Sequence, residues 1–441
     1  MKNALCRVIA AALTAALYPA SGLAQGEPRT QAAGPVSGNR GEAVDTSRQK
    51  LNVTVDVGEA YDQNAIARSS EAVFSLFQGN GFYTTLTPGV DFTLTGERVQ
   101  LGVNAGSSAR YYSEYGESII TNESAGFGIS VRFTPETTFT FSEGMTYAAS
   151  LLSGVFGSTT TPLVADLTAP VATNYALNTT RSYASATAAS LTRRLSRRAE
   201  LQFTSNLQYT LTTRDAGYPD LRSRDAGGVL TYSLTQGVGL KLGYTFRQAQ
   251  YTGSPASTEH DLNIGIAYAK PLSKTRKMTM TFMAGPTMAT APLLAGLSDV
   301  RRQYRVTADA SLRREIGRTW SLQGNYHRGL GYIEGLQGPV FTGAYTGSAE
   351  GFLSRRTDLS MSVAYSTGES ALTGSASEFT TYTGDIRLRY AATRTWSFYA
   401  EYIYVYYLFN REIGLPTFLP PGLSRNGFRT GMMLRVPVRR R

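Results

Sequence analysis

The chain has 441 residues, of which 42% are hydrophobic, 17% charged and 11% aromatic, with 27 tyrosines and a formal net charge of +11. This many aromatic residues exclude intrinsic disorder of the whole chain, and 44 glycines with 17 prolines are too close to average for collagen. No internal apolar run reaches about 18 residues, which excludes a transmembrane helix.

Residues 1–24 have the pattern of a secretory signal peptide. Lys2 and Arg7 give a positive start, an apolar run covers Val8 to Leu17, and small residues at 22–24 suit cleavage. The sequence therefore predicts export from the cytoplasm.

The single cysteine, Cys6, lies in the predicted signal peptide. The mature chain is therefore expected to have no disulfide, no thiol chemistry and no cysteine-bound metal. Residues 25–50 are small and polar and are predicted to form a flexible periplasmic leader. The remaining residues, 51–441, are predicted to form one domain.

Short polar turn clusters recur along this domain every 38 to 43 residues, apart from one step of 62. Such a step fits two strands of about 12 to 15 residues and a connection at their far end. Strands of this length are longer than those of a typical soluble sheet. The step of 62 contains an insert at 151–178. The turn clusters lie at 95–98, 134–137, 196–198, 235–237, 273–276, 317–319, 354–357 and 393–395.

Between the turns, large apolar residues alternate with polar ones. From Leu201 to Leu211 the odd positions are mostly apolar and the even positions polar, and Val238 to Arg247 alternates in the same way. A period of two indicates strands with one apolar and one polar face. The sequence predicts an almost entirely antiparallel β structure.

Strands of about a dozen residues match a tilted crossing of a bilayer, where only helices and closed barrels pair every backbone group. Eight short turns join 16 strands. One strand before them, 51–61, and one after them, 424–438, bring the total to 18, with 16 as the fallback. A soluble β-solenoid or large sandwich is the alternative. The predicted fold is an all-β, antiparallel outer-membrane β-barrel of a Gram-negative-type bacterium.

Aromatic residues beside the short turns are expected to lie at the membrane interface. They are Phe92, Phe133, Phe139, Trp320 and Trp396.

Charged residues on the polar faces are expected to line the lumen, because an arginine at mid-depth on the lipid face costs about 2–4 kcal/mol. Two interpretations stay open: a basic pore that prefers anions, or Arg–Asp pairs that brace the wall. The predicted basic residues are Lys241, Arg247, Arg305, Arg313, Arg387, Arg389, Arg429 and Arg435. The predicted acidic residues are Asp56, Asp91, Asp309, Asp385 and Glu401.

Two segments carry resemblances to known families. The stretch 430–436, with Gly431, Leu434 and Val436, resembles the carboxy-terminal assembly signal of bacterial outer-membrane proteins, which implies the barrel-assembly machinery as a partner. The stretch 53–64 and the Thr-Pro-Gly at 87–89 are similar to the β-barrel porin 2 family. That resemblance implies an 18-stranded barrel associated with exopolysaccharide export.

Enzyme chemistry has little support. The two histidines, His260 and His327, could serve an outer-membrane hydrolase, but a solvated pore or rim position explains them better, and no nucleophile, zinc or phosphate-loop motif is present. We expect no catalytic residue, no cofactor, no metal site and no nucleic-acid partner, since the basic residues are spread over the whole domain.

The insert 151–178 has two interpretations. It could fold into the lumen as a constriction or stay at the surface. It holds one acidic residue, Asp166, and no basic residue, so it is no obvious charge filter.

The sequence thus predicts an outer-membrane channel for hydrophilic cargo, with polysaccharide export as the favoured role. A general or anion-preferring diffusion porin is the alternative, and a plugged structural or adhesive barrel is the third. The expected partners are outer-membrane lipid and either polysaccharide or small anionic solutes.

Overall fold

The computed structural model describes residues 49–65, 79–112, 118–148, 182–212, 219–273, 276–292, 300–317, 319–332, 339–371, 378–410 and 422–440. The predicted signal peptide, the leader up to residue 48 and the insert 151–178 lie outside the described residues. Within those ranges, no helix is long and apolar enough to cross a membrane.

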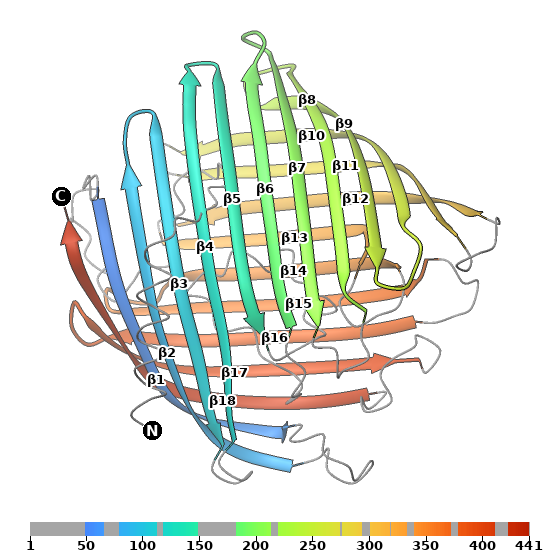
Figure 1. The fold of residues 1–441 in the computed structure, drawn as a ribbon. Coiled ribbons are helices and arrows are strands. Elements are labelled where there is room, and N and C mark those ends of the chain that lie inside the picture. The colour runs from blue at the N-terminus through green and yellow to red at the C-terminus, as the bar shows by residue number, and fades with distance from the viewer. Residues whose placement is uncertain are drawn as a thin grey trace.

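The described chain forms one antiparallel sheet whose strands follow one another around a ring (Figure 1). The strands are β1 (Gln49–Ala65), β2 (Gly79–Thr95), β3 (Val99–Tyr112), β4 (Ser118–Thr134), β5 (Thr137–Ala148), β6 (Ser182–Arg194), β7 (Ala199–Thr212), β8 (Leu221–Ser233), β9 (Val238–Tyr251), β10 (Ser257–Ser273), β11 (Arg276–Pro292), β12 (Val300–Ile316), β13 (Trp320–Gly331), β14 (Val340–Phe352), β15 (Thr357–Ser370), β16 (Glu378–Ala391), β17 (Trp396–Phe409) and β18 (Gly422–Arg440).

The ring closes between its first and last strands. β1 pairs with β2 on one side and with β18 on the other, for example Val57 with Met432. Figure 1 shows the blue β1 beside the red β18. The predicted closed barrel of 18 strands is confirmed. β1 begins at Gln49, two residues inside the predicted leader, because Gln49 and Lys50 still pair with β2.

One local structure recurs among the short turns. In four of them a Ser or Thr side-chain oxygen accepts hydrogen bonds from the backbone N–H groups two and three residues ahead, which holds the turn closed. The start of β1 and the end of β18 lie at this same end of the barrel. Short turns face the periplasm in bacterial barrels, so the longer connections face outward from the cell. The four residues are Ser196, Thr235, Ser354 and Thr393.

The two faces of the sheet differ in the contacts they make. Tyr399 on β17 reaches Asp56 on β1, and Arg429 on β18 reaches Tyr83 on β2, so each contact skips a strand. In a closed ring such contacts form only on the concave side, where side chains converge. The opposite face exposes large apolar residues, such as Ile264 at 66%. This apolar outer face is the surface that a bilayer requires.

The five aromatic residues predicted at the interface lie on this outer face near the short turns, and the rings of Phe133 and Phe139 stack at 6.3 Å. Their contact with a membrane interface stays a prediction.

A second aromatic row crosses five strands on the same face toward the longer connections. On β17, ten residues separate Trp396 from Tyr406, which spans about 25 Å at the usual rise and tilt and equals the height of a barrel's apolar band. Beneath this row a shallow groove of about 830 Å³ runs over Gly347 and Gly384. The row is Tyr326, Tyr345, Tyr365, Tyr382 and Tyr406.

Two glycines allow the closure of the ring. Gly58 and Gly431 are paired across β1 and β18, and the Tyr399 side chain passes over both to reach Asp56. A Cβ at Gly431 would lie 2.7 Å from the Tyr399 hydroxyl and 2.7 Å from the Val57 carbonyl oxygen. The backbone contact leaves no room for a side chain.

We therefore predict that Gly431→Ala destabilises the barrel by about 1–3 kcal/mol, the usual cost of overpacking. Gly102→Ala is the matched control, because a Cβ at Gly102 meets nothing within 4 Å. The measurement is the temperature at which the folded band disappears in heat-modifiability gels. Equal temperatures for the two variants would show that the Tyr399 crossing does not constrain the closure.

Candidate functional site

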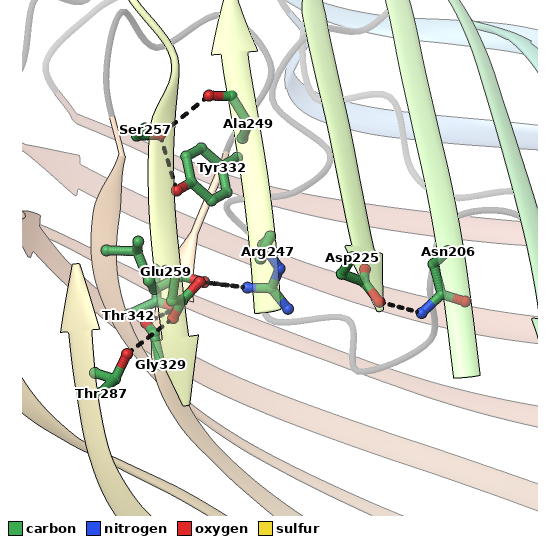
Figure 2. Close-up of polar contacts among 11 residues, drawn as sticks. Asn206, Asp225, Arg247, Ala249, Ser257, Glu259, Thr287, Gly329, Tyr332 and Thr342 are labelled. Carbon is green, nitrogen blue, oxygen red and sulfur yellow. Dashed lines mark hydrogen bonds and ion pairs between the residues drawn. The ribbon is translucent and has the colours of Figure 1, made fainter. Parts of the chain in front are cut away.

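A row of polar side chains crosses the inner face of β7 to β10. The Asn206 amide donates to Asp225 at 2.7 Å, and Arg247 forms an ion pair with Glu259 at 3.1 Å. These four residues are aligned by the strand register, and Figure 2 shows Arg247 pointing along the wall toward Glu259. Thr287 on β11 donates a further hydrogen bond to Glu259, which is only 1% exposed.

The outer ends of β13 and β14 fold inward and cover part of this row. β12 starts at Val300, yet its pairing with β13 ends at Ala308, so the upper part of β13 leaves the wall. We call residues 328–332 and 339–342 the inner flap. Arg247 donates to the Leu330 carbonyl oxygen at 3.1 Å. Figure 2 shows the second contact, in which Ser257 on β10 donates to the Tyr332 hydroxyl at 2.9 Å.

Apolar packing holds the inner flap against the wall. Leu330 and Phe341, each 4% exposed, form a buried cluster with Ala289 on β11. By the alternation of their strands, both residues would face lipid. The inward fold turns that same face onto the inner wall of the barrel, which replaces lipid contact with packing against the barrel itself.

Tyr332 joins the inner flap to two further strands. It packs against Leu221 and Tyr251, with ring centroids of the two tyrosines 6.4 Å apart. Burial raises the pKa of Tyr332, which lies past the end of β13, to about 12. The phenol is therefore neutral and accepts the Ser257 hydrogen bond throughout the physiological range.

A second group of charged residues lies on the inner face of β15 to β18 and β1. Asp56 accepts a hydrogen bond from Tyr399 at 2.8 Å and lies 3.9 Å from the Arg387 guanidinium, which stacks over the Tyr399 ring at 4.3 Å. Arg389 forms an ion pair with Asp358 at 2.9 Å. Because Arg389 is opposite Tyr399 in the strand register, the two groups lie side by side near the closure of the ring.

The network continues around β2 and β3. Arg429 lies 3.7 Å from Glu401 and donates to the Tyr83 hydroxyl at 3.3 Å, while Arg110 stacks over the Tyr83 ring at 5.8 Å. Arg425 forms an ion pair with Asp62. We call the five basic residues of this region the arginine wall: Arg110, Arg387, Arg389, Arg425 and Arg429.

Four members of the arginine wall have a buried N–H group that forms no hydrogen bond. These groups are Nη1 and Nη2 of Arg110, Nε of Arg387, Nη2 of Arg429 and Nε of Arg425, whose Nη2 pairs with Asp62. Arg110 is 1% exposed, and the structure shows no acidic partner for it among the described residues. An unsatisfied buried donor costs free energy, so these groups favour a negatively charged or water ligand.

The register places all thirteen predicted lumen residues on the concave face, but only some of them meet. Asp56, Arg387, Arg389, Glu401 and Arg429 share the network above, whereas the other eight lie in separate places. Among these, Asp91 accepts from Asn52, Asp309 contacts His327 at 2.6 Å, Asp385 accepts from Ser362 and Arg305 pairs with Glu369 at 2.9 Å. Lys241, Arg313 and Arg435 lie on the same face of β9, β12 and β18. Their roles in selectivity stay predictions.

Several interior residues went unrecognised in the sequence. Asp62 and Arg425 continue the polar face of β1 and β18, and Arg110 does so on β3, so longer strand limits and the same alternation would have revealed them. Glu259 likewise follows the period of β10. The position of Tyr332 had no sequence signal, because it depends on the inward fold of β13.

The two histidines lie on opposite faces. His327 contacts Asp309 inside the barrel, whereas His260 contacts Tyr244 at 2.9 Å on the outer face. They therefore do not form one site. Within the described ranges, no group of three or more acidic, histidine or cysteine residues could hold a metal ion.

No protein-family model matches the chain, and no curated protein matches it either. The resemblance to the β-barrel porin 2 family therefore stands on its short motifs alone. The assembly-signal role of Gly431, Leu434 and Val436 likewise stays a prediction, with Leu434 and Val436 on the outer face and Gly431 on the inner one.

Solved structures with a similar fold include Pseudomonas aeruginosa OpdQ, with 10% identity and a TM-score of 0.44 over 89% of this chain and 98% of that one. P. aeruginosa OccK2 (OpdF) in complex with glucuronate has 11% identity and a TM-score of 0.43 over 89% and 98%. Acinetobacter baumannii OccAB4 has 8% identity and a TM-score of 0.42 over 90% and 100%. At these values the likeness shows no shared substrate. The closed, even-numbered barrel with an apolar belt is by itself the architecture of an outer-membrane β-barrel protein.

Proposed function

We propose that the chain is a diffusion channel of the outer membrane that passes small hydrophilic solutes and prefers anions. An 18-stranded ring is wide enough for a water-filled lumen. The inner face between the charged groups supports this role, because it carries hydroxyl and amide pairs such as Thr281 with Ser311 and Asn325 with Thr346.

The observation that carries the anion preference is the set of unsatisfied N–H groups on Arg110, Arg387 and Arg429. Donors held inside a barrel favour negative charge, and rings of basic residues select anions. The paired arginines, such as Arg389 with Asp358, are better explained as braces of the wall. We therefore combine the two interpretations from the sequence: Arg389 braces the wall, Arg110 stabilises anions, and Arg387 and Arg429, which are also paired with acids, contribute to both.

The inner flap favours small solutes over polysaccharide export. It lies across part of the inner wall and is fixed there by Leu330, Phe341 and Tyr332. A flexible polymer chain needs a wide and continuous path, which an inward fold of this kind narrows. A plugged barrel would conduct no ions, so conductance separates that alternative.

Arg110→Gln is predicted to lower the chloride-to-potassium permeability ratio by about fivefold. This factor corresponds to roughly 1 kcal/mol, the stabilisation of an anion by a unit charge at about 4 Å in water. The measurement is the reversal potential in planar bilayers under a KCl gradient. Arg110 suits the test because its loss leaves no acidic partner unpaired among the described residues.

Arg314→Gln is the control for that experiment. Arg314 is exposed on the outer face of β12 near the short turns, so its loss should leave the reversal potential unchanged. An unchanged potential in Arg110→Gln as well would contradict the anion site. The absence of any conductance in the native chain would contradict the channel itself.

Tyr332→Ala is predicted to release the inner flap and raise the single-channel conductance. The substitution removes about 3 kcal/mol of aromatic packing and the hydrogen bond from Ser257. Tyr304→Ala is the control, because Tyr304 lies on the outer face and is 71% exposed. If Tyr332→Ala conducts like Tyr304→Ala, the inner flap does not narrow the path.

A further inference from the structure

Two arginines lie on the outer face of the barrel, where lipid is expected. Arg222 and Arg224 are the second and fourth residues of β8, and both are exposed. Arg222 pairs in register with Tyr209, and Arg224 with Leu207 on one side and Gln248 on the other. Because β8 starts at the end of the barrel that faces outward from the cell, both side chains lie at the outer membrane surface.

Neighbouring residues hold both guanidinium groups in place. Arg222 stacks over the Tyr209 ring at 5.0 Å and donates to its hydroxyl at 3.3 Å. Arg224 donates through Nε at 2.9 Å and through Nη2 to the Gln248 side-chain oxygen. These contacts orient each group and leave its other N–H donors exposed.

The surface formed by these residues presents donors rather than acceptors. Since the Gln248 oxygen accepts from Arg224, the side-chain amide nitrogen of Gln248 brings two further N–H donors to this surface. Asp220, two residues before Arg222, accepts instead from the backbone N–H of Thr212 at 2.9 Å. The arginines thus have no acidic partner on the described outer face of β7 to β10.

An apolar surface begins directly below the arginines. On the outer faces of β8 and β9 the next residues toward the membrane are Ala226 and Phe246, and Phe246 is paired in register with His260 on β10. Leu262, the following outer residue of β10, is 52% exposed. An anion bound by Arg222 and Arg224 would therefore be in contact with water above and with acyl chains below. Only an anionic group attached to a lipid satisfies both conditions.

We propose that Arg222, Arg224 and Gln248 form a binding site for the phosphate group of an outer-leaflet lipid. Two arginines at positions i and i+2 on one strand lie about 7 Å apart, so both can donate to the oxygens of one phosphate. The acyl chains of the same lipid lie against the apolar surface beneath. This site is separate from the channel interior, since it lies on the opposite face of the sheet.

The test titrates the full chain in detergent micelles with diphosphorylated lipid A and measures binding by native mass spectrometry. The variant Arg222→Gln/Arg224→Gln should bind about tenfold more weakly than the native chain, as expected from the loss of charge-assisted hydrogen bonds. The control Arg193→Gln/Arg314→Gln removes two exposed arginines of the outer face near the short turns and should bind as the native chain does.

Two further arms identify the ligand chemistry. Lipid A stripped of its phosphates should bind the native chain and the Arg222→Gln/Arg224→Gln variant equally weakly, and excess inorganic phosphate should not displace intact lipid A. The native conductance of that variant checks that it is folded.

Three results would overturn the proposal. One is equal affinity of the native chain and the Arg222→Gln/Arg224→Gln variant for lipid A. Another is tight binding of the phosphate-free lipid, which would assign the affinity to the apolar surface alone. The third is displacement by inorganic phosphate, which would assign the site to soluble anions.

Discussion

The closed pairing of backbone groups is the constraint from which the other features follow. A barrel in lipid has no water to satisfy a free strand edge, so β1 must pair with β18, and it does so from Lys50 to Asp62. Closure gives the sheet one concave and one convex face. Because side chains alternate in direction along a strand, each residue points to one of these two faces. The Gly58–Gly431 pair lies at this seam, where the Tyr399 side chain crosses two backbones to hydrogen-bond Asp56.

Charge inside the ring is organised by the same closure. Side chains converge on the concave face, so Arg387 on β16 reaches Asp56 on β1 and Arg429 on β18 reaches Tyr83 on β2, each across at least one intervening strand. Arg110 stacks over the same Tyr83 ring from the neighbouring strand β3. Most of these charges are paired and brace the wall. Buried N–H groups of Arg110, Arg387 and Arg429 nevertheless form no hydrogen bond, and the proposed anion preference rests on them.

Alternation and turn spacing predicted the number of strands, their faces and the end at which the termini lie. They did not predict the inner flap, because Leu330 and Phe341 have the period of lipid-facing residues and their burial depends on contacts with β11. The sequence also predicted charged residues in the lumen as a general rule, but Glu143 lies on the outer face of β5. There Ser185 donates a hydrogen bond to one carboxylate oxygen of Glu143 at 2.9 Å, and Thr187 donates to the other oxygen. Local period determines the face of a residue, whereas the surroundings of that face depend on tertiary structure.

Arg222 and Arg224 show that the cost of a charged side chain depends on its depth in the membrane as well as on the face of the sheet that carries it. An arginine on the lipid side costs about 2–4 kcal/mol at the midplane but about 0–1 kcal/mol near the interface. Arg222 and Arg224 lie at the outermost end of β8, so their exposure to lipid costs little, and their contacts with Tyr209 and Gln248 prepare them for an anion. Inside the barrel, comparable guanidinium groups such as those of Arg389 and Arg429 are buried and lie beside acidic side chains. The same chemical group is therefore suited to brace the wall, and by our proposals to attract solutes or bind lipid, according to the face and the height at which it lies on the strand.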